Sequence, residues 1–137
     1  MSRATIINYY EPSLLTNAER KHQTVLVMKL FELWKLTYKQ QAIALGLSAN
    51  TESSIHNYKS GKHPLPQLRD IQDRIRLLLT IHKYLRRAYP YNKELAYLWI
   101  TTPNLDFDHL SPFDIIFRDG YLGLVKIKNY LEINQLS

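Results

Sequence analysis

The spacing of apolar residues predicts helices along most of this chain, and the longest is expected over residues 67–89. One side of that segment repeats at intervals that alternate between three and four residues, which is the seam pattern of packed helix pairs. The seam positions are Leu68, Ile71, Ile75, Leu78, His82, Leu85 and Tyr89. This seam can pack within one chain or between two copies. His82 is expected there as a satisfied core or interface histidine rather than as a metal ligand.

An earlier helix is predicted to begin after Thr16, because Thr16 and Glu19 have the spacing of a capping box. It is expected to run to about Leu36 and carries apolar residues on most of its faces. A helix that is apolar all round is usually buried between other helices. We therefore assign this helix to the core.

Three shorter helices are predicted after Pro90. Asn92 is placed to cap a helix over residues 93–100, with an apolar face of Leu95, Leu98 and Trp99. The sequence SPFD at 111–114 combines an N-cap, a first-turn proline and an N3 acid, and the helix it starts would stop at Gly120. The final helix, over residues 121–133, would bury Leu124, Ile127 and Leu131. No stretch has a convincing strand pattern, so the expected fold class is all-α.

Residues 38–62 predict two short helices joined by a tight turn. Gly46 suits the left-handed residue that ends the first helix, and Gly61 would end the second. Ser48 or Asn50 can cap the second helix. Two helices joined at a glycine, with an outer face rich in amides and hydroxyls, are typical of a helix-turn-helix DNA reader. The alternative is an ordinary helical hairpin, which any small helical protein can contain.

If the segment reads DNA, we expect residues 49–60 to lie in the major groove. Asn57 can make two hydrogen bonds to adenine, while hydroxyl groups can reach phosphates or either type of base. The candidates for such contacts are Thr51, Ser53, Ser54, His56 and Asn57. The cations expected to clamp phosphates are Lys39, Lys59, Lys62 and His63. Ile55 and Tyr58 are expected to face inward, towards the other helix.

The net charge of +6 hides a difference between the two parts of the chain. Residues 1–93 hold 15 of the 18 Lys and Arg but only 6 of the 12 Asp and Glu. Residues 94–137 hold 3 basic and 6 acidic residues. A basic N-terminal part favours a polyanion such as nucleic acid, whereas the acidic C-terminal part would be repelled by phosphates.

The chain lacks the residue patterns that common catalytic and metal sites require. It contains no cysteine, and its five histidines are scattered without the spacing of metal ligands. Its four glycines form no phosphate-binding loop, and no nucleophile elbow is present. The aspartates between residues 106 and 119 do not have the spacing of a calcium loop, and are interpreted as a solvated or partner-facing surface. We expect no enzymatic activity, no metal and no cofactor.

The sequence also argues against a membrane partner. No apolar run approaches the length of a membrane span, and the first residues lack the layout of a signal peptide. We therefore expect a cytoplasmic protein.

Residues 95–131 contain an ordered set of short motifs. These are Leu98-Trp99, Pro103-Asn104, Phe107, Ser111-Pro112, Asp114-Ile115-Ile116, Gly120, Leu124-Val125 and Tyr130-Leu131. Their order resembles the toxin-binding domain of the Xre/MbcA/ParS antitoxin family. Residues 38–62 resemble the Xre and phage-repressor type of helix-turn-helix, in Ala42, Leu45-Gly46-Leu47-Ser48 and residues 55–61. The stretch between Ser48 and Ile55 is a few residues longer than in the usual motif.

This resemblance implies a type II antitoxin, a homodimer that binds its own operator DNA and neutralises a cognate toxin. Toxins of this family carry a RES domain and attack NAD or ADP-ribosylate a target, and the antitoxin's C-terminal domain covers the entrance to the toxin's active site. Besides the final helix, the residues we choose for that contact are Trp99, Arg118, Asp119 and Tyr121, although Trp99 is also a candidate core residue.

The expected organisation is an N-terminal arm over residues 1–15, a helix-turn-helix domain over 16–63, and a helical domain for dimerisation and toxin binding over 64–137. Helix-turn-helix readers usually act as twofold pairs on palindromic sites, so we slightly favour the 67–89 seam as the dimer interface.

Two other functions fit parts of the same sequence. One is a stand-alone phage-type repressor without a toxin, in which the C-terminal part serves only dimerisation. The other is a protein-interaction module whose helix-turn-helix no longer binds DNA. A RES-type reading frame beside the gene would favour the antitoxin.

Overall fold

The computed structural model describes residues 15–48 and 52–136, and over these residues the fold is all-α, as predicted. The α-helices are α2 (Asn17–Leu33), α3 (Tyr38–Leu45), α4 (Glu52–Lys59), α5 (Arg69–Ala88), α6 (Lys93–Leu98), α7 (Pro112–Asp119) and α8 (Tyr121–Leu136). Two 3₁₀ turns, η3 (Trp99–Thr101) and η4 (Leu105–Phe107), lie between α6 and α7. The predicted arm over residues 1–15 lies, except for Leu15, outside the described residues.

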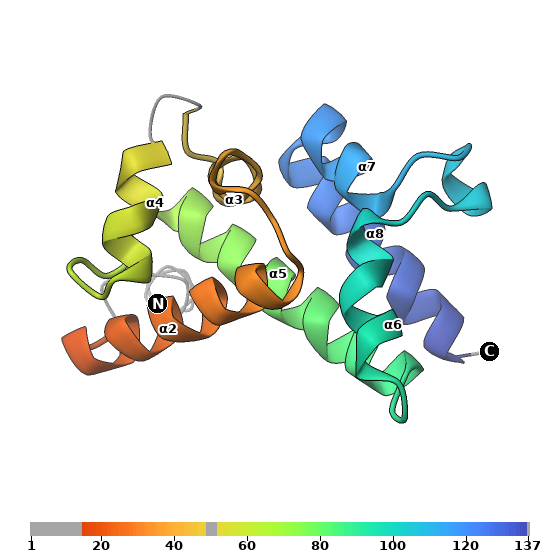
Figure 1. The fold of residues 1–137 in the computed structure, drawn as a ribbon, viewed down its shortest axis with the longest axis horizontal. Helices are drawn as coiled ribbons and strands as arrows, with labels where there is room; N and C mark the ends of the chain where they lie inside the picture. The colour runs from red at the N-terminus through yellow and green to blue at the C-terminus, as the bar shows by residue number, and fades with distance from the viewer. Residues whose placement is uncertain (1–14, 49–51, 137) are drawn as a thin grey trace, which may run out of the picture.

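Helix α5 runs through the middle of the molecule and contacts most of the other helices (Figure 1). Helices α2, α3, α6 and α8 all pack on it. Helix α8 runs beside much of its length, from the groove that Tyr121 lines with Arg69, Asp70 and Asp73 to the hydrogen bond that Gln135 donates to the carbonyl of Tyr84. Its buried apolar residues are Ile71, Ile75, Leu78, Ile81 and Leu85. The predicted seam is therefore buried within a single chain, and the preference for it as a dimer interface was wrong. Leu68, at the N-cap, is the seam position that stays exposed.

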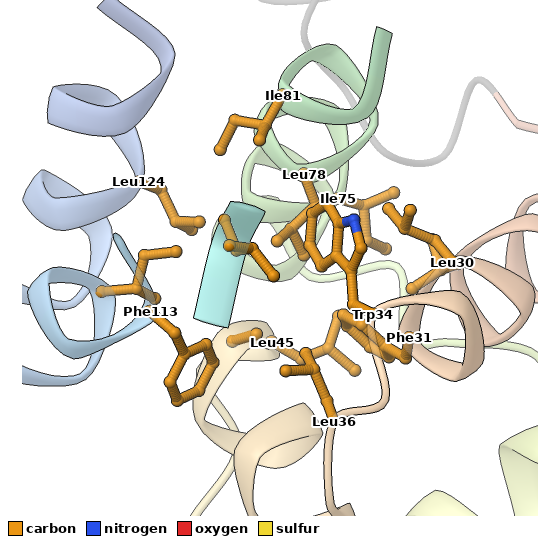
Figure 2. Close-up of a cluster of buried hydrophobic side chains, with 14 of the residues drawn as sticks. Leu30, Phe31, Trp34, Leu36, Leu45, Ile75, Leu78, Ile81, Phe113 and Leu124 are labelled. Atoms are coloured by element: carbon orange, nitrogen blue, oxygen red, sulfur yellow. The ribbon is translucent and has the colours of Figure 1, made fainter. Parts of the chain in front are cut away.

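The hydrophobic core is continuous across the boundary expected near residue 63. Figure 2 shows Phe31 and Trp34 of α2 beside Ile75 and Leu78 of α5, with Leu45 of α3 below them. Phe113 of α7 and Leu124 of α8 lie on the other side of the same cluster (Figure 2). The two expected domains thus share one core, because α5 supplies buried side chains to both.

Helix α2 is only partly buried, in contrast to the prediction. The capping box of Thr16 and Glu19 forms as expected. One face of the helix is buried through Val27, Met28, Leu30 and Phe31. However, Val25 is 62% exposed and Leu26 is 44% exposed. Neighbouring helices cover one face of α2, so apolar residues on its other faces remain accessible to solvent.

His82 is half-buried and stacks on Tyr97 of α6, with 6.1 Å between the ring centroids. Its Nδ1 is buried without a hydrogen-bond partner, so the expectation of a satisfied histidine was wrong. Burial, together with the positive charge of Arg86, lowers the pKa of His82 below its usual value. The neutral form is the one that such surroundings favour.

The start of helix α6 agrees with the prediction, but its buried face does not. Asn92 caps the helix by accepting the N–H of Leu95. Leu95 and Leu98 are about half exposed, whereas Ala96 and Ile100 are completely buried. Because Ala96 and Ile100 are four residues apart, they lie on one side of a single helical turn, and that side faces α5 and α7.

Helices α7 and α8 form a close pair that begins with the predicted capping box. Ser111 and Asp114 exchange the expected hydrogen bonds, and Gly120 ends α7 with a φ of 61°. Leu124, Ile127 and Leu131 are buried as predicted. At Gly123 the two helices approach so closely that an added Cβ would lie 2.5 Å from the carbonyl oxygen of Ile115. None of the described helices is long and apolar enough to cross a bilayer.

Changing Gly123 to Ala should destabilise the protein by about 1–3 kcal/mol, because backbone atoms of α7 leave no room for the methyl group. The higher helix propensity of Ala offsets at most about 1 kcal/mol of this cost. Asn129→Ala, at an exposed position of the same helix, is the matched control and should stay within about 0.5 kcal/mol of the wild type. Urea denaturation followed by circular dichroism measures both changes. Equal stability of the two variants would contradict the close approach.

Candidate nucleic-acid interface and partner surface

Helix α3, which precedes the turn to α4, has a defined cap at each end. Thr37 accepts the N–H of Gln40, and the side chain of Gln40 accepts the N–H of Thr37. This capping box starts α3 at Tyr38, and its Thr-x-x-Gln spacing is a signal that the sequence analysis missed. Gly46 ends the helix in the left-handed conformation, with a φ of 77°, as predicted.

Helix α4 packs against α2 and α3 through its inward face. Ile55 is completely buried and Tyr58 is half-buried, as expected for the inward positions. In Figure 1, α3 is seen nearly along its axis while α4 is seen from the side, so the two helices cross steeply. Gly61 has a φ of 82° and lies in the turn that ends α4.

The turn after α4 is organised by one backbone carbonyl. The oxygen of Asn57 accepts the N–H of Lys62 at 3.0 Å and the hydroxyl of Ser60 at 3.1 Å. The N–H of His63 also donates to it at 3.4 Å. These bonds hold Lys62 and His63 beside the C-terminal end of α4, next to Lys59.

The structure places the basic candidates for DNA contact at the surface. Lys39, His56, Lys59, Lys62 and His63 are exposed, while Ser54 and Asn57 are half-buried. Thr51 and the side chain of Ser53 lie outside the described part of the chain. The Nζ of Lys59 lies 5.7 Å from the centre of the Tyr38 ring. That contact brings Lys59 of α4 to the start of α3, where Lys39 follows Tyr38.

Arg74 is a residue that sequence reasoning missed. Its Nε pairs with the carboxylate of Asp70 at 3.2 Å, and its side chain is 13% exposed. A Cβ at Gly46 would lie 2.6 Å from Nε of Arg74, and a Cβ at Gly120 would lie 3.9 Å from its Nη2. The guanidinium thus lies between the C-terminal ends of α3 and α7, where the helix dipoles favour a cation. The only signal in the sequence is the four-residue spacing of Asp70 and Arg74.

Three of the four residues chosen for partner contact lie together at the turn between α7 and α8. Asp119 accepts hydrogen bonds from Arg118 at 3.0 Å and from Lys126 at 2.7 Å. Beside this ion pair, Phe117 and Leu122 are more than 60% exposed, and Tyr121 is 39% exposed. We call Phe117, Arg118, Asp119, Tyr121 and Leu122 the α7–α8 surface. It combines apolar side chains with charges of both signs.

Trp99 does not belong to the α7–α8 surface. Its ring stacks on Tyr130 and meets the edge of Phe107, with centroid distances of 6.0 Å and 6.3 Å. Tyr130 follows Tyr121 by nine positions in α8, which corresponds to about 13 Å along the helix axis. The hydroxyl of Tyr130 donates to Asp106, and this bond raises the pKa of Tyr130. Trp99 is therefore a half-buried packing residue of a second cluster.

The α7–α8 surface lies close to the helices proposed to contact DNA. Tyr121 lines an open groove of about 500 Å³ together with Arg69, Asp70 and Asp73 at the start of α5. Helix α7 also packs against α3. Part of the acidic C-terminal region, α7 and the start of α8, therefore lies next to α3 and the start of α5. Within residues 15–48 and 52–136, no three His, Asp or Glu side chains gather where they could hold a metal ion.

The ion pairs of Asp119 predict an unusually acidic carboxyl group. Hydrogen bonds from Arg118 and Lys126 lower the pKa of Asp119 to about 2, from an ordinary value of 3.8. Since the folded-state pKa is the lower one, these bonds stabilise the fold above pH 3.8, and their contribution is lost as the pH falls towards 2.

Carboxyl ¹³C NMR titration should give this low pKa in the wild type and a value near 3.8 in the Arg118→Gln, Lys126→Gln double variant. Lys128→Gln removes a lysine that pairs with Glu132 instead, so it should leave Asp119 unchanged. A normal pKa for Asp119 in the wild type would mean that the ion pairs do not form in solution.

A comparison with protein-family models finds no match to this chain, and a comparison with curated proteins finds none either. The function of the two surfaces must therefore be argued from their geometry and from the sequence motifs.

Proposed function

We propose that this protein is the DNA-binding antitoxin of a type II toxin–antitoxin system. The observation that carries the proposal is the arrangement of α3 and α4. Helix α4 buries Ile55 against its neighbours, while Lys39, Lys59, Lys62 and His63 remain exposed around it. A short helix that crosses its partner steeply after a left-handed glycine is the arrangement that a helix-turn-helix requires.

In this proposal α4 is the recognition helix and enters the major groove. Asn57 is half-buried and lies in the last turn of the helix, two residues before Lys59. With Ser54 and His56 it supplies the base-edge and phosphate contacts in this proposal. The exposed lysines gather around the C-terminal end of α4 and the start of α3, and in this proposal they bind the phosphates. The cation–π contact of Lys59 with Tyr38 supports this, because it fixes a cation between α3 and α4.

The α7–α8 surface is the part that we propose binds the toxin. Exposed Phe117 and Leu122 form an apolar centre, and the ion pair of Arg118 with Asp119 forms a charged rim. An apolar centre with a charged rim is the usual composition of a protein–protein interface. The resemblance of residues 95–131 to the family's toxin-binding domain supports a toxin of the RES type, with the chemistry wholly in that partner.

A homodimer on a palindromic operator needs an interface other than the α5 seam. Ile71, Ile75, Leu78 and Leu85 of that seam are buried within one chain, so they are not available for contact with a second copy. We propose that the twofold contact uses exposed side chains, and that the operator half-sites lie about one helical turn of DNA apart.

Asn57→Ala and Lys59→Ala should weaken operator binding in two different ways. The loss of Asn57 should cost about 1–3 kcal/mol and relax the preference for one base pair. The loss of Lys59 should weaken binding to all sequences and reduce the salt dependence by about one phosphate contact. Lys83→Ala, at an exposed position of α5, is the control and should bind like the wild type. Fluorescence anisotropy with a fragment of the gene's own promoter at several salt concentrations measures these changes.

Unchanged affinity of both α4 variants for the promoter fragment would contradict the assignment of α4 as the recognition helix. Failure of the wild type to bind any promoter fragment at low salt would favour a pure protein-interaction module.

Phe117→Asp and Leu122→Asp should abolish rescue from the product of the neighbouring gene while leaving operator binding intact. Loss of a central apolar contact costs about 2 kcal/mol or more, a drop of roughly thirtyfold in affinity. Tyr91→Asp is the matched control, because Tyr91 is 99% exposed and lies in the turn between α5 and α6. Co-expression followed by growth scoring and co-purification tests the three variants. Operator binding without any toxic or co-purifying neighbour would favour the stand-alone repressor.

A further inference from the structure

A groove of about 400 Å³ lies between α2, α4 and the turn that follows α4. Its wall on α2 contains Lys21, Val25 and Lys29, which recur every four residues and therefore lie on one face of the helix. The exposure of Val25 thus has a structural reason, because this face of α2 borders the groove. The volume falls within the range of small-molecule sites, which is about 300–1,000 Å³.

The opposite wall of the groove is held in place by hydrogen bonds to α2. The backbone N–H of Leu65 donates to the hydroxyl of Thr24 at 2.8 Å, and its carbonyl accepts from Arg20 at 3.1 Å. Leu65 itself is completely buried. The turn that carries His63 and Pro64 is therefore anchored through both the N–H and the carbonyl of Leu65, so the groove exists before any ligand binds.

The chemistry of the lining favours an apolar anion. The apolar part consists of Val25, Met28, Tyr58 and Pro64. Three lysines and a histidine line the groove around them, against a single carboxylate from Glu32; these cations are Lys21, Lys29, Lys59 and His63. The C-terminal end of α4 would disfavour an anion, but the carbonyl of Asn57 already accepts three hydrogen bonds there. Positive charge beside an apolar floor is complementary to an aromatic or aliphatic carboxylate or sulfonate.

We propose that this groove binds a small apolar anion, and that the bound anion competes with DNA for Lys59 and His63. The binding step stands on the groove alone. The competition rests on the proposed function, because Lys59 and His63 are also assigned to DNA phosphates. An anion seated between α2 and α4 would occupy these two basic side chains and reduce the affinity for the operator.

Fluorescence titration of the full chain with 8-anilinonaphthalene-1-sulfonate, an apolar anion, tests the binding step. Val25→Glu should weaken binding by about tenfold or more, because it places a carboxylate at the wall of the groove. Leu26→Glu makes the same change one residue later, where the side chain borders a different groove without any lysine or arginine. Leu26 is also exposed, so neither change should unfold the protein. Circular dichroism of the variants checks that.

The expected result is weaker binding of the dye to Val25→Glu than to Leu26→Glu, together with weak binding of the uncharged analogue N-phenyl-1-naphthylamine. Equal affinity of the two variants for the dye would overturn the site. If the wild type binds the uncharged analogue as tightly as the dye, the choice of an anion is overturned. A dye affinity that falls as the protein concentration rises would show that a second copy covers the groove, and would also overturn the proposal.

A separate measurement distinguishes failure of the groove from failure of the proposed function. Excess operator DNA should lower the apparent affinity of the wild type for the dye by at least tenfold. If the dye binds in a manner that depends on Val25 but DNA that binds the protein does not displace it, the competition is wrong while the site remains. If the dye does not bind and the operator does, the groove proposal fails and DNA binding is unaffected.

Discussion

The burial of one face of α5 is the constraint on which the rest of this fold depends. Ile75, Leu78, Ile81 and Leu85 are completely buried, and each is covered by helices from the same chain. Replacing any one of them by Ala would lower the free energy of unfolding by about 2–5 kcal/mol, a large part of the stability of a domain of this size. Because α2, α3, α6 and α8 all pack on α5, this helix fixes the relative position of both candidate surfaces.

Arg74 adds a polar link to the same arrangement. Its guanidinium lies between Gly46, which ends α3, and Gly120, which ends α7, and both positions have a positive φ. The proposed DNA-reading hairpin and the α7–α8 surface therefore meet at one side chain of α5. A partner bound at Tyr121 would lie next to the start of α5 and close to α3. In the proposed function, the toxin and operator DNA would therefore bind at neighbouring parts of the molecule.

Three local signals in the sequence, two caps and one turn, gave correct predictions, although the capping box at Thr37 was missed. The capping boxes at Thr16 and Ser111 and the left-handed turn at Gly46 depend on side chains within three residues of each other, and all three form. Predictions of burial were less reliable. Val25, Leu26, Leu95 and Leu98 are apolar and lie in helices, yet they are exposed because none of the other described helices covers them. The pattern within a helix shows which face is apolar, but another element decides whether it is covered.

The sequence by itself determined the helical class, the caps, and the inward positions Ile55 and Tyr58 of α4, since these follow from spacing and local hydrogen bonding. Only the tertiary structure decided that the α5 seam packs within the chain, because a three-four repeat is the same for intramolecular and intermolecular partners. Only the structure separated Trp99 from Arg118, Asp119 and Tyr121, and placed Arg74 against Gly46. Those relations join residues far apart in the chain, and distance in sequence carries no information about them.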